Sequence, residues 1–168
     1  MQQQIRQAGL EDIDELSQVH IESWKAAYKH FLPAEVFDWV TPEKWAERLK
    51  ESIEDSSAEI AVLTDGNKII GSITACACRD EDYESAGELC EFYLRPGYWR
   101  QGLGTKLVNW SLQRLKEKGF NRVTLWVFEE SHGSRKFYER LGFREEGTVR
   151  STRIDESIRV IRYIKDLS

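Results

Sequence analysis

The feature that most constrains this chain is a strand pattern that runs into a glycine-containing turn and then into an amphipathic helix. We expect the strand over residues 88–94 and the helix over 102–118, with Gly102 and Gly104 at the junction. The first N–H groups of a helix have no partner within it, so they can bind an anion. Glycine lets the anion approach the backbone closely. This junction therefore predicts a site for a phosphate-bearing ligand.

Two common nucleotide-binding motifs do not fit this junction. Leu107 stands where the dinucleotide fingerprint requires a third glycine. The Gly-Lys-Ser or Gly-Lys-Thr of the Walker motif is also missing at the required spacing. The junction is therefore better interpreted as a phosphate nest of another kind.

The remaining pattern predicts an α+β fold. Strands are expected over residues 5–8, 59–64, 68–79, 88–94, 122–128, 144–153 and 156–164, and helices over 13–31, 42–53, 102–118 and 131–141. The run Asp12-Ile13-Asp14-Glu15 indicates a capping box that opens the first helix. This order favours a mostly antiparallel mixed sheet flanked by helices, with one parallel step around the helix after Gly102. We expect one domain over residues 1–168.

Composition narrows the class of protein. The chain has 168 residues, a net charge of −5 and a pI of about 5.4, which disfavours a nucleic-acid-binding protein. No run approaches the ~18 apolar residues of a membrane span, and the start lacks the apolar core of a signal peptide. We therefore expect a cytoplasmic protein with no membrane partner. Cys76, Cys78 and Cys90 are expected to be reduced, buried thiols, and no metal is expected, because the Cys76–Cys78 pair lacks a second pair or a histidine.

Two blocks of the sequence resemble the GNAT family of N-acetyltransferases. Residues 94–104 are similar to that family's pyrophosphate-binding motif, and residues 125–143 carry its Phe-Tyr and Gly-Phe landmarks. The order of elements is similar too, so the resemblance implies a GNAT-like acyl-CoA N-acyltransferase fold over nearly the whole chain. Two positions depart from the motifs: Trp99 replaces the usual Gln or Arg, and Ser131 replaces the usual Asn.

The resemblance implies acetyl-CoA as co-substrate and an amine as acceptor, joined by direct attack in a ternary complex. The implied cofactor-binding residues lie in the glycine turn and at the start of the 131–141 helix: Leu94, Arg100, Gln101, Gly102, Leu103, Gly104, Thr105, Ser131 and Ser134. Further cations near these positions are expected to meet the CoA phosphates: Arg95, Arg135 and Lys136.

The resemblance also implies catalytic roles. Tyr138 occupies the position that protonates the CoA thiolate, and a phenol keeps its proton at neutral pH. Glu88 is the expected base for the amine proton, with Glu91 as the alternative. By strand alternation Glu91 faces the other side of the sheet unless a β-bulge intervenes. The N–H of Leu94 is the expected oxyanion donor.

The acceptor side is less defined by the sequence. By resemblance Trp24, Tyr28 and Phe31 wall the acceptor site, although an apolar stripe on a helix also fits core packing. The acidic loop over residues 80–84 is interpreted either as solvated surface or as a region that attracts a cationic amine. The alternative function is a non-catalytic acyl-CoA-binding or regulatory module on the same fold. The acceptor's identity, the acyl-chain length and a homodimeric state stay open.

Overall fold

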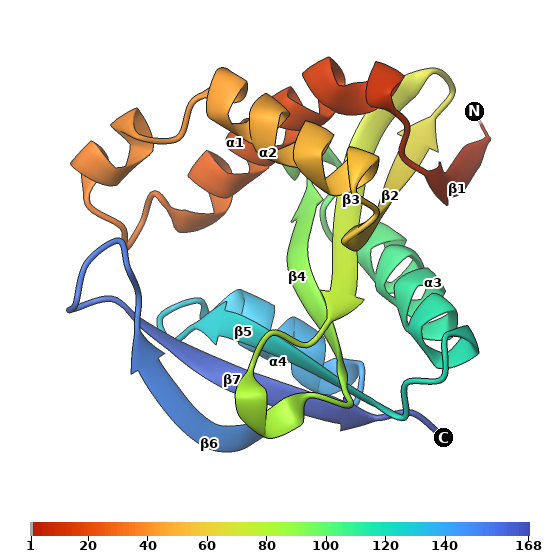
Figure 1. Ribbon diagram of the computed structural model, residues 1–168. Coiled ribbons are helices and arrows are strands. Elements are labelled where there is room, and N and C mark those ends of the chain that lie inside the picture. The colour runs from red at the N-terminus through yellow and green to blue at the C-terminus, as the bar shows by residue number, and fades with distance from the viewer. Residues whose placement is uncertain (1) are drawn as a thin grey trace.

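The computed structural model describes residues 2–168 (Figure 1). Its strands are β1 (Gln3–Gln7), β2 (Ala58–Asp65), β3 (Lys68–Ala77), β4 (Gly87–Leu94), β5 (Arg122–Phe128), β6 (Arg144–Ser151) and β7 (Arg159–Asp166). Its helices are α1 (Ile13–Tyr28), α2 (Pro42–Glu54), α3 (Leu103–Glu117) and α4 (His132–Arg140). Short 3-10 helices lie at Leu10–Asp12, Ala34–Asp38, Glu81–Tyr83 and Pro96–Tyr98. The predicted order of strands and α-helices is confirmed.

The strands of residues 2–168 form one seven-stranded sheet in the order β1-β2-β3-β4-β5-β7-β6. Neighbouring strands are antiparallel except β4 and β5, which run parallel and are joined through α3. A parallel pair requires such a crossover, because a tight turn can join only antiparallel strands. The predicted α+β class, with one parallel step around α3, is confirmed.

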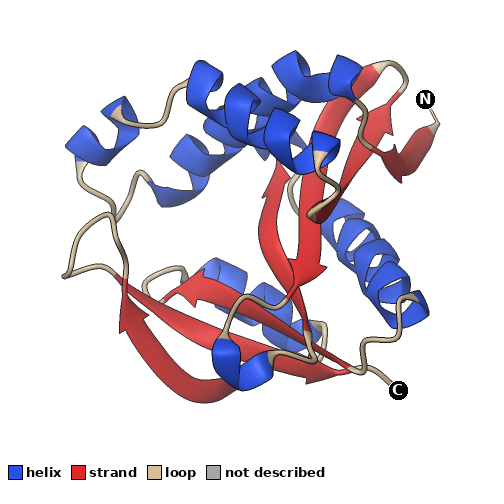
Figure 2. Ribbon diagram, viewed as in Figure 1, coloured by secondary structure: helices blue, strands red, loops and turns tan. Residues whose placement is uncertain are grey.

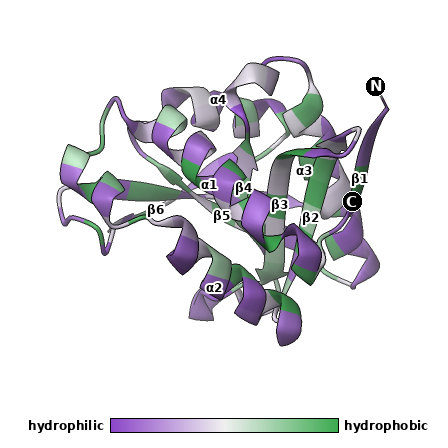
Figure 3. Ribbon diagram, turned by 90° about the horizontal axis from the view of Figure 1, so that it is seen from above, coloured by the Kyte–Doolittle hydropathy of each residue, from purple (hydrophilic) through white to green (hydrophobic). Residues whose placement is uncertain are grey.

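Helices cover both faces of the sheet at β2 and β3. Ile60 and Val62 of β2 belong to a core with α1 and α2, whereas Ala61 and Leu63 pack with α3. Successive side chains of a strand point to opposite faces, so a strand covered on both sides is apolar along its length. In Figure 3, β2 is largely hydrophobic and the outlying α2 is largely hydrophilic. No helix among residues 2–168 has the length and apolarity needed to cross a bilayer.

The start of α1 differs from the predicted capping box. Asp12 accepts a hydrogen bond from the N–H of Gly9 at 2.8 Å and pairs with both terminal nitrogens of Arg6 at 2.7 and 2.8 Å. Its carboxylate therefore closes the short turn before α1 and does not cap α1 itself. The hydrogen bond from Arg6 holds the pKa of Asp12 below its usual value.

The end of α1 also differs from the prediction. The helix stops at Tyr28 and does not continue to Phe31. The N–H groups of Phe31 and Leu32 both turn back to the carbonyl of Tyr28, at 3.2 and 3.0 Å, and Pro33 follows. The chain thus leaves the helix early and places Phe31 in the loop beside the end of β5.

Candidate active site

Strands β4 and β5 diverge at the centre of the sheet, and we call the region where their backbones are no longer paired the opening. The two strands pair only over Gly87–Leu89 and Val123–Leu125, and beyond that point they diverge (Figures 1 and 2). The later part of β4 therefore has a strand neighbour only on its β3 side within residues 2–168. An unpaired strand edge is a template for an extended ligand that carries amides.

The backbone of β4 presents hydrogen-bonding groups to this opening. Arg95 donates its N–H to the carbonyl of Ile70 at 2.8 Å, which makes Gly71 and Leu94 a non-hydrogen-bonded pair. The N–H and C=O of Leu94 consequently point away from β3, into the opening. The same holds for Phe92, two residues earlier in an unbroken register.

A β-bulge in β4 changes which side chains share a face. Thr74 of β3 pairs with Glu91, but the next residue, Ala75, pairs with Leu89, so Cys90 is an extra residue. The bulge places Cys90 and Glu91 on the wall of the same cavity. The bulge on which the Glu91 alternative depends is therefore present.

This cavity has a volume of about 280 Å³ and lies between α2, the start of β2, the end of β3 and the middle of β4. Its polar wall consists of Arg48, Ser52, Ser57, Thr74, Cys76, Arg79, Cys90 and Glu91. The hydroxyl of Thr74 is buried and has no hydrogen-bond partner among residues 2–168. A buried polar group without a partner is costly, so the cavity is suited to a ligand with a polar group.

The two carboxylates of β4 have different partners. Glu88 has a side chain only 3% exposed, and Arg79 donates to both of its oxygens, at 2.7 and 3.1 Å. Glu91 pairs with Arg48 of α2 at 2.5 Å, at the cavity wall. Burial raises the pKa of Glu91, and the nearby positive charges of Arg48 and Arg79 offset this only in part. Glu88 is thus held in a bidentate ion pair, whereas Glu91 faces the cavity.

The glycine turn has the backbone that its sequence predicts. Gly102 has a φ of 77° and immediately precedes α3, and Arg100 has a φ of 60°, where a side chain is disfavoured. A Cβ on Gly104 would lie 3.0 Å from Phe92 and 3.3 Å from Phe137. Gly104 therefore lets α3 approach β4 and α4, while the N–H groups at the start of α3 have no partner within the helix.

Two side chains of the turn hold its shape. Trp99 donates its indole N–H to the carbonyl of Leu94 at 2.6 Å, and Gln101 donates its amide to the carbonyl of Gly97 at 3.0 Å. Trp99, where the resemblance has Gln or Arg, thus ties the turn to the end of β4.

The cations near the turn divide into engaged and exposed groups. Arg95 donates to the carbonyl of Ile69 at 3.0 Å and forms an ion pair with Glu22 of α1. Arg135 donates to the phenol oxygen of Tyr163 at 3.1 Å. Arg100 and Lys136 are exposed.

Helix α4 brings Tyr138 to the same region. Phe137 stacks on Phe92 of β4, with ring centroids 5.5 Å apart and an interplanar angle of 8°. Burial, and next the neighbouring Tyr28 phenol, raise the pKa of Tyr138, so it keeps its proton at neutral pH. At the start of α4 the hydroxyl of Ser131 donates to that of Ser134 at 2.8 Å and does not cap the backbone.

Tyr93 packs against His20 of α1 and Trp45 of α2, and the sequence did not single it out. Its pKa is raised by burial and then by the nearby charges of Tyr28, Glu91 and Tyr138. The ring of His20 lies 4.7 Å from that of Tyr93. Its only signal in the sequence is that it follows Glu91 by two residues, which puts both side chains on one face of β4. The sequence did not reveal the bulge at Cys90, so it did not show which face that is.

The predicted acceptor wall is an aromatic cluster beside β5. Tyr28 and Phe31 lie 4.7 and 5.6 Å from Phe128, and Trp24 packs on Phe37 at 4.9 Å. Trp24 is buried, and these rings belong to the core between α1 and the end of β5. They border the end of β5, and none of them lines the 280 Å³ cavity.

Two of the four carboxylates of the acidic loop, Asp80 and Asp82, form ion pairs with arginines. Buried Arg162 of β7 pairs with Asp80 at 3.2 Å and with Asp82 at 2.5 Å, and Arg150 also pairs with Asp80 at 3.4 Å. These partners lie far from the loop in the sequence, so the loop pattern alone gave no sign of them. The ion pairs favour a structural role for these two carboxylates over attraction of a cationic ligand.

A sequence model described as the acetyltransferase (GNAT) family matches residues 24–143 of the chain. Among named relatives, the spermidine N(1)-acetyltransferase of Thermoplasma acidophilum is 28% identical, over 86% of this chain and 90% of the relative. An uncharacterized N-acetyltransferase of Methanocaldococcus jannaschii is 26% identical over 87% of this chain, and the match spans 62% of that protein's length.

The fold is similar to solved acetyltransferase structures. The PaiA N-acetyltransferase of Thermoplasma acidophilum, in complex with coenzyme A, matches with a TM-score of 0.80 and 24% identity, over 99% of this chain and 100% of that one. The ribosomal-protein-S18-alanine N-acetyltransferase of Escherichia coli matches with a TM-score of 0.72 and 20% identity, over 99% and 95%. With residues 24–143 fitting the family's sequence pattern and the whole fold matching its structures, this chain belongs to the GNAT acetyltransferase family.

Proposed function

We propose that the protein transfers an acetyl group from acetyl-CoA to a primary amine of a small molecule or peptide. The observation that carries this proposal is the course of β4. Its unpaired edge leads from the phosphate-binding turn to a bulge that turns Glu91 into a 280 Å³ cavity. One strand thus connects a place for CoA to a place for an acceptor.

The glycine turn supports the cofactor half of the proposal. The pyrophosphate would accept hydrogen bonds from the N–H groups of residues 101–105, with Arg100 and Lys136 as exposed cations near the remaining phosphates. The pantetheine arm would run from the turn toward the free edge of β4 at Leu94. Ser131 and Ser134, at the start of α4, lie on the other side of the arm.

The chemistry follows from the groups around β4. Glu91 takes the proton of the bound ammonium, directly or through water, and the free amine attacks the thioester carbon. The N–H of Leu94 stabilises the negative oxygen of the tetrahedral intermediate. The C–S bond then breaks, and Tyr138 gives its proton to the departing thiolate. The attacking nitrogen loses its second proton, which returns through solvent to the Tyr138 phenolate and leaves a neutral amide. Of the two carboxylates in β4, we assign the base to Glu91, because Arg79 occupies both oxygens of Glu88.

The cavity beside Glu91 is proposed to hold the acceptor amine, and the aromatic residues Trp24, Tyr28 and Phe31 to close the other side of the opening. The spermidine acetyltransferase relative supports an amine as acceptor class. The pairing of Asp80 and Asp82 with Arg162 gives no support to a polyamine in particular.

The test is a CoA-thiol release assay with acetyl-CoA and a panel of amines: amino acids, polyamines, aminoglycosides and peptides with free N-termini. We expect turnover on one class, and a loss of kcat in Tyr138→Phe with CoA affinity retained by calorimetry. Tyr83→Phe, which alters a phenol stacked under Arg162 at 4.5 Å, is the matched control. CoA binding without turnover on any amine would favour the acyl-CoA-binding module.

A further inference from the structure

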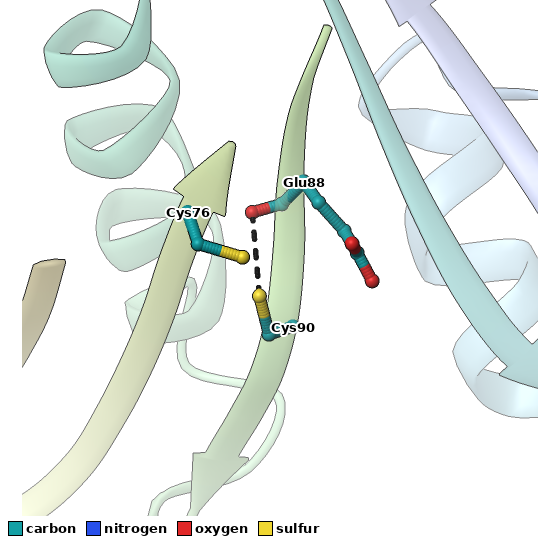
Figure 4. A group of neighbouring side chains, drawn as sticks. All are labelled: Cys76, Glu88 and Cys90. Atoms are coloured by element: carbon teal, nitrogen blue, oxygen red, sulfur yellow. Dashed lines mark hydrogen bonds between the residues drawn. The ribbon is translucent and has the colours of Figure 1, made fainter. Parts of the chain in front are cut away.

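Three potential metal-binding side chains meet at the bulge of β4. Cys76 of β3 stands opposite Glu88 in the strand register, and the extra residue Cys90 turns its thiol toward Cys76 (Figure 4). The two Sγ atoms and a carboxylate oxygen of Glu88 all lie within 4.8 Å of one another. The bulge creates this group, since the sequence pattern alone pairs Cys76 with Cys78.

The donor set matches a particular kind of cation. Two thiolates and a carboxylate are ligands of Zn²⁺ and of its tetrahedral substitutes Co²⁺ and Cd²⁺. With metal–ligand bonds of roughly 2.0–2.3 Å, a tetrahedral ion needs donor atoms about 3.5–3.8 Å apart. The observed upper limit of 4.8 Å requires only a small closing of three side chains around the ion.

We propose that Cys76, Glu88 and Cys90 form a binding site for a zinc-like divalent cation.

The surroundings of the three ligands support this assignment. Arg79 holds the carboxylate of Glu88 through its side chain at 2.7 and 3.1 Å and through its backbone N–H at 3.1 Å. Metal-ligating carboxylates are commonly oriented in this way by a second hydrogen-bonding residue. A bound ion takes one carboxylate oxygen and displaces the hydrogen bonding of Arg79 to it, while the other oxygen stays bonded to Arg79.

The fourth coordination position faces the 280 Å³ cavity, because Cys76 and Cys90 both line it. Three protein ligands and one open position are the arrangement of a zinc ion that binds water or a small ligand. The buried hydroxyl of Thr74 on the same wall is a partner for that water. If the cavity also holds the acceptor amine, a bound ion keeps that amine out. This consequence rests on the proposed function, whereas the cation site itself does not.

The third cysteine supplies a control. The thiol of Cys78 lies 3.2 Å from the hydroxyl of Thr124 in β5 and belongs to neither the ligand group nor the cavity wall. Cys78→Ser therefore removes one thiol of the same chemistry without touching the proposed site.

The experiment is an anaerobic titration of the full chain with Co²⁺ in a phosphine reductant, followed by absorption spectroscopy. We expect one equivalent to bind with thiolate-to-cobalt charge transfer and the visible bands of tetrahedral Co²⁺. Cys76→Ser and Cys90→Ser should lose the charge-transfer intensity or bind at least tenfold more weakly, while Cys78→Ser binds like the wild type. Wild type without these bands, or equal loss in Cys78→Ser, would overturn the proposal.

A second measurement guards against misfolded variants. In the wild-type chain loaded with Zn²⁺, we expect a thiol-alkylating reagent to modify Cys78 faster than Cys76 and Cys90, and chelation to abolish the difference. Arg79→Gln should weaken Zn²⁺ affinity about tenfold, as is usual when a residue that orients a ligand is removed. Zn²⁺ that leaves the alkylation rates of Cys76 and Cys90 unchanged would contradict the site.

Discussion

The indole N–H of Trp99 donates to the main-chain oxygen of Leu94 at 2.6 Å. This bond joins the glycine turn to the last residue of β4, the two segments to which we assign the pyrophosphate and the thioester. A side chain that is unusual for the motif thus fixes the distance between both ends of the proposed cofactor site.

Trp99→Phe keeps an aromatic ring and removes this hydrogen bond. A lost hydrogen bond of this kind costs about 1 kcal/mol, so we expect CoA to bind about fivefold more weakly. Isothermal titration of CoA measures the effect, and Trp39→Phe, at a side chain 63% exposed and remote from the turn, is the control. Equal CoA affinities in all three proteins would show that the bond does not shape the cofactor site.

Alanine substitutions at the two glycines of the turn should each lower the free energy of unfolding, for different reasons. Gly104→Ala places a Cβ 3.0 Å from Phe92, and such overpacking typically costs about 1–3 kcal/mol of unfolding free energy. Gly102→Ala meets nothing within 4 Å but must hold a φ of 77°, at a cost of roughly 1–2 kcal/mol. Urea denaturation checks both, with Gly97→Ala, in open space at negative φ, expected to be nearly neutral.

Amide substitutions of the two carboxylates of β4 should have different effects on kcat. Glu91→Gln removes the proposed base from the cavity, and we expect kcat to fall roughly 10²–10⁴-fold with CoA affinity unchanged. Glu88→Gln removes the buried charge that pairs with Arg79, so we expect its main effect on the free energy of unfolding. A larger loss of kcat in Glu88→Gln than in Glu91→Gln would reverse the assignment.

The stability of the protein should depend on pH through His20. Burial lowers the pKa of His20 from 6.5 to about 3 in the folded state, and its Nε2 lies 2.7 Å from the hydroxyl of Ser72. Below pH 6.5 the imidazole of His20 becomes protonated in the unfolded chain but stays neutral in the folded chain. Stability is therefore full above pH 6.5 and falls as the pH drops toward 3, by up to about 1.4 kcal/mol per pH unit.

Urea denaturation at pH 7.5 and 5.5 tests this dependence. His20→Gln should lower stability at pH 7.5 and show a smaller drop between the two pH values than the wild type. Because the carboxylates whose pKa values are lowered, such as Asp12, lose their stabilising charge only nearer pH 4, they contribute little in this range. An equal drop in both proteins would exclude His20 as the source.

Much of the fold was predictable because its signals are local. The glycine after the strand 88–94, the glycines that end α3 and α4, and the Pro42 start of α2 each depend on neighbouring residues only. The parallel step followed from the helix between two strands. The start of α1 at Ile13 was predicted correctly, but the capping role of Asp12 was not, because Arg6 and the N–H of Gly9 are its partners.

The site was less predictable because its key contacts are distant in sequence. No pattern along β4 reveals that Cys90 is a bulge, yet this residue decides where Glu91 points and brings Cys90 beside Cys76. Glu88 pairs with Arg79, and Asp80 pairs with Arg162. Both ion pairs are visible only in the folded structure. Sequence could offer Glu88 and Glu91 as alternatives, and the burial and pairing of each side chain distinguish them.

The most direct test of the account is intact-mass spectrometry of the protein incubated with acetyl-CoA, with and without the amine that supports CoA release. Direct attack predicts an acetylated amine only in the complete mixture, and an unmodified protein mass in both. A protein that gains an acetyl group before the amine is added would contradict direct attack, and Cys76 and Cys90 are the thiols on the cavity wall beside Glu91 that could carry the group. Release of CoA without an acetylated amine would contradict it as well.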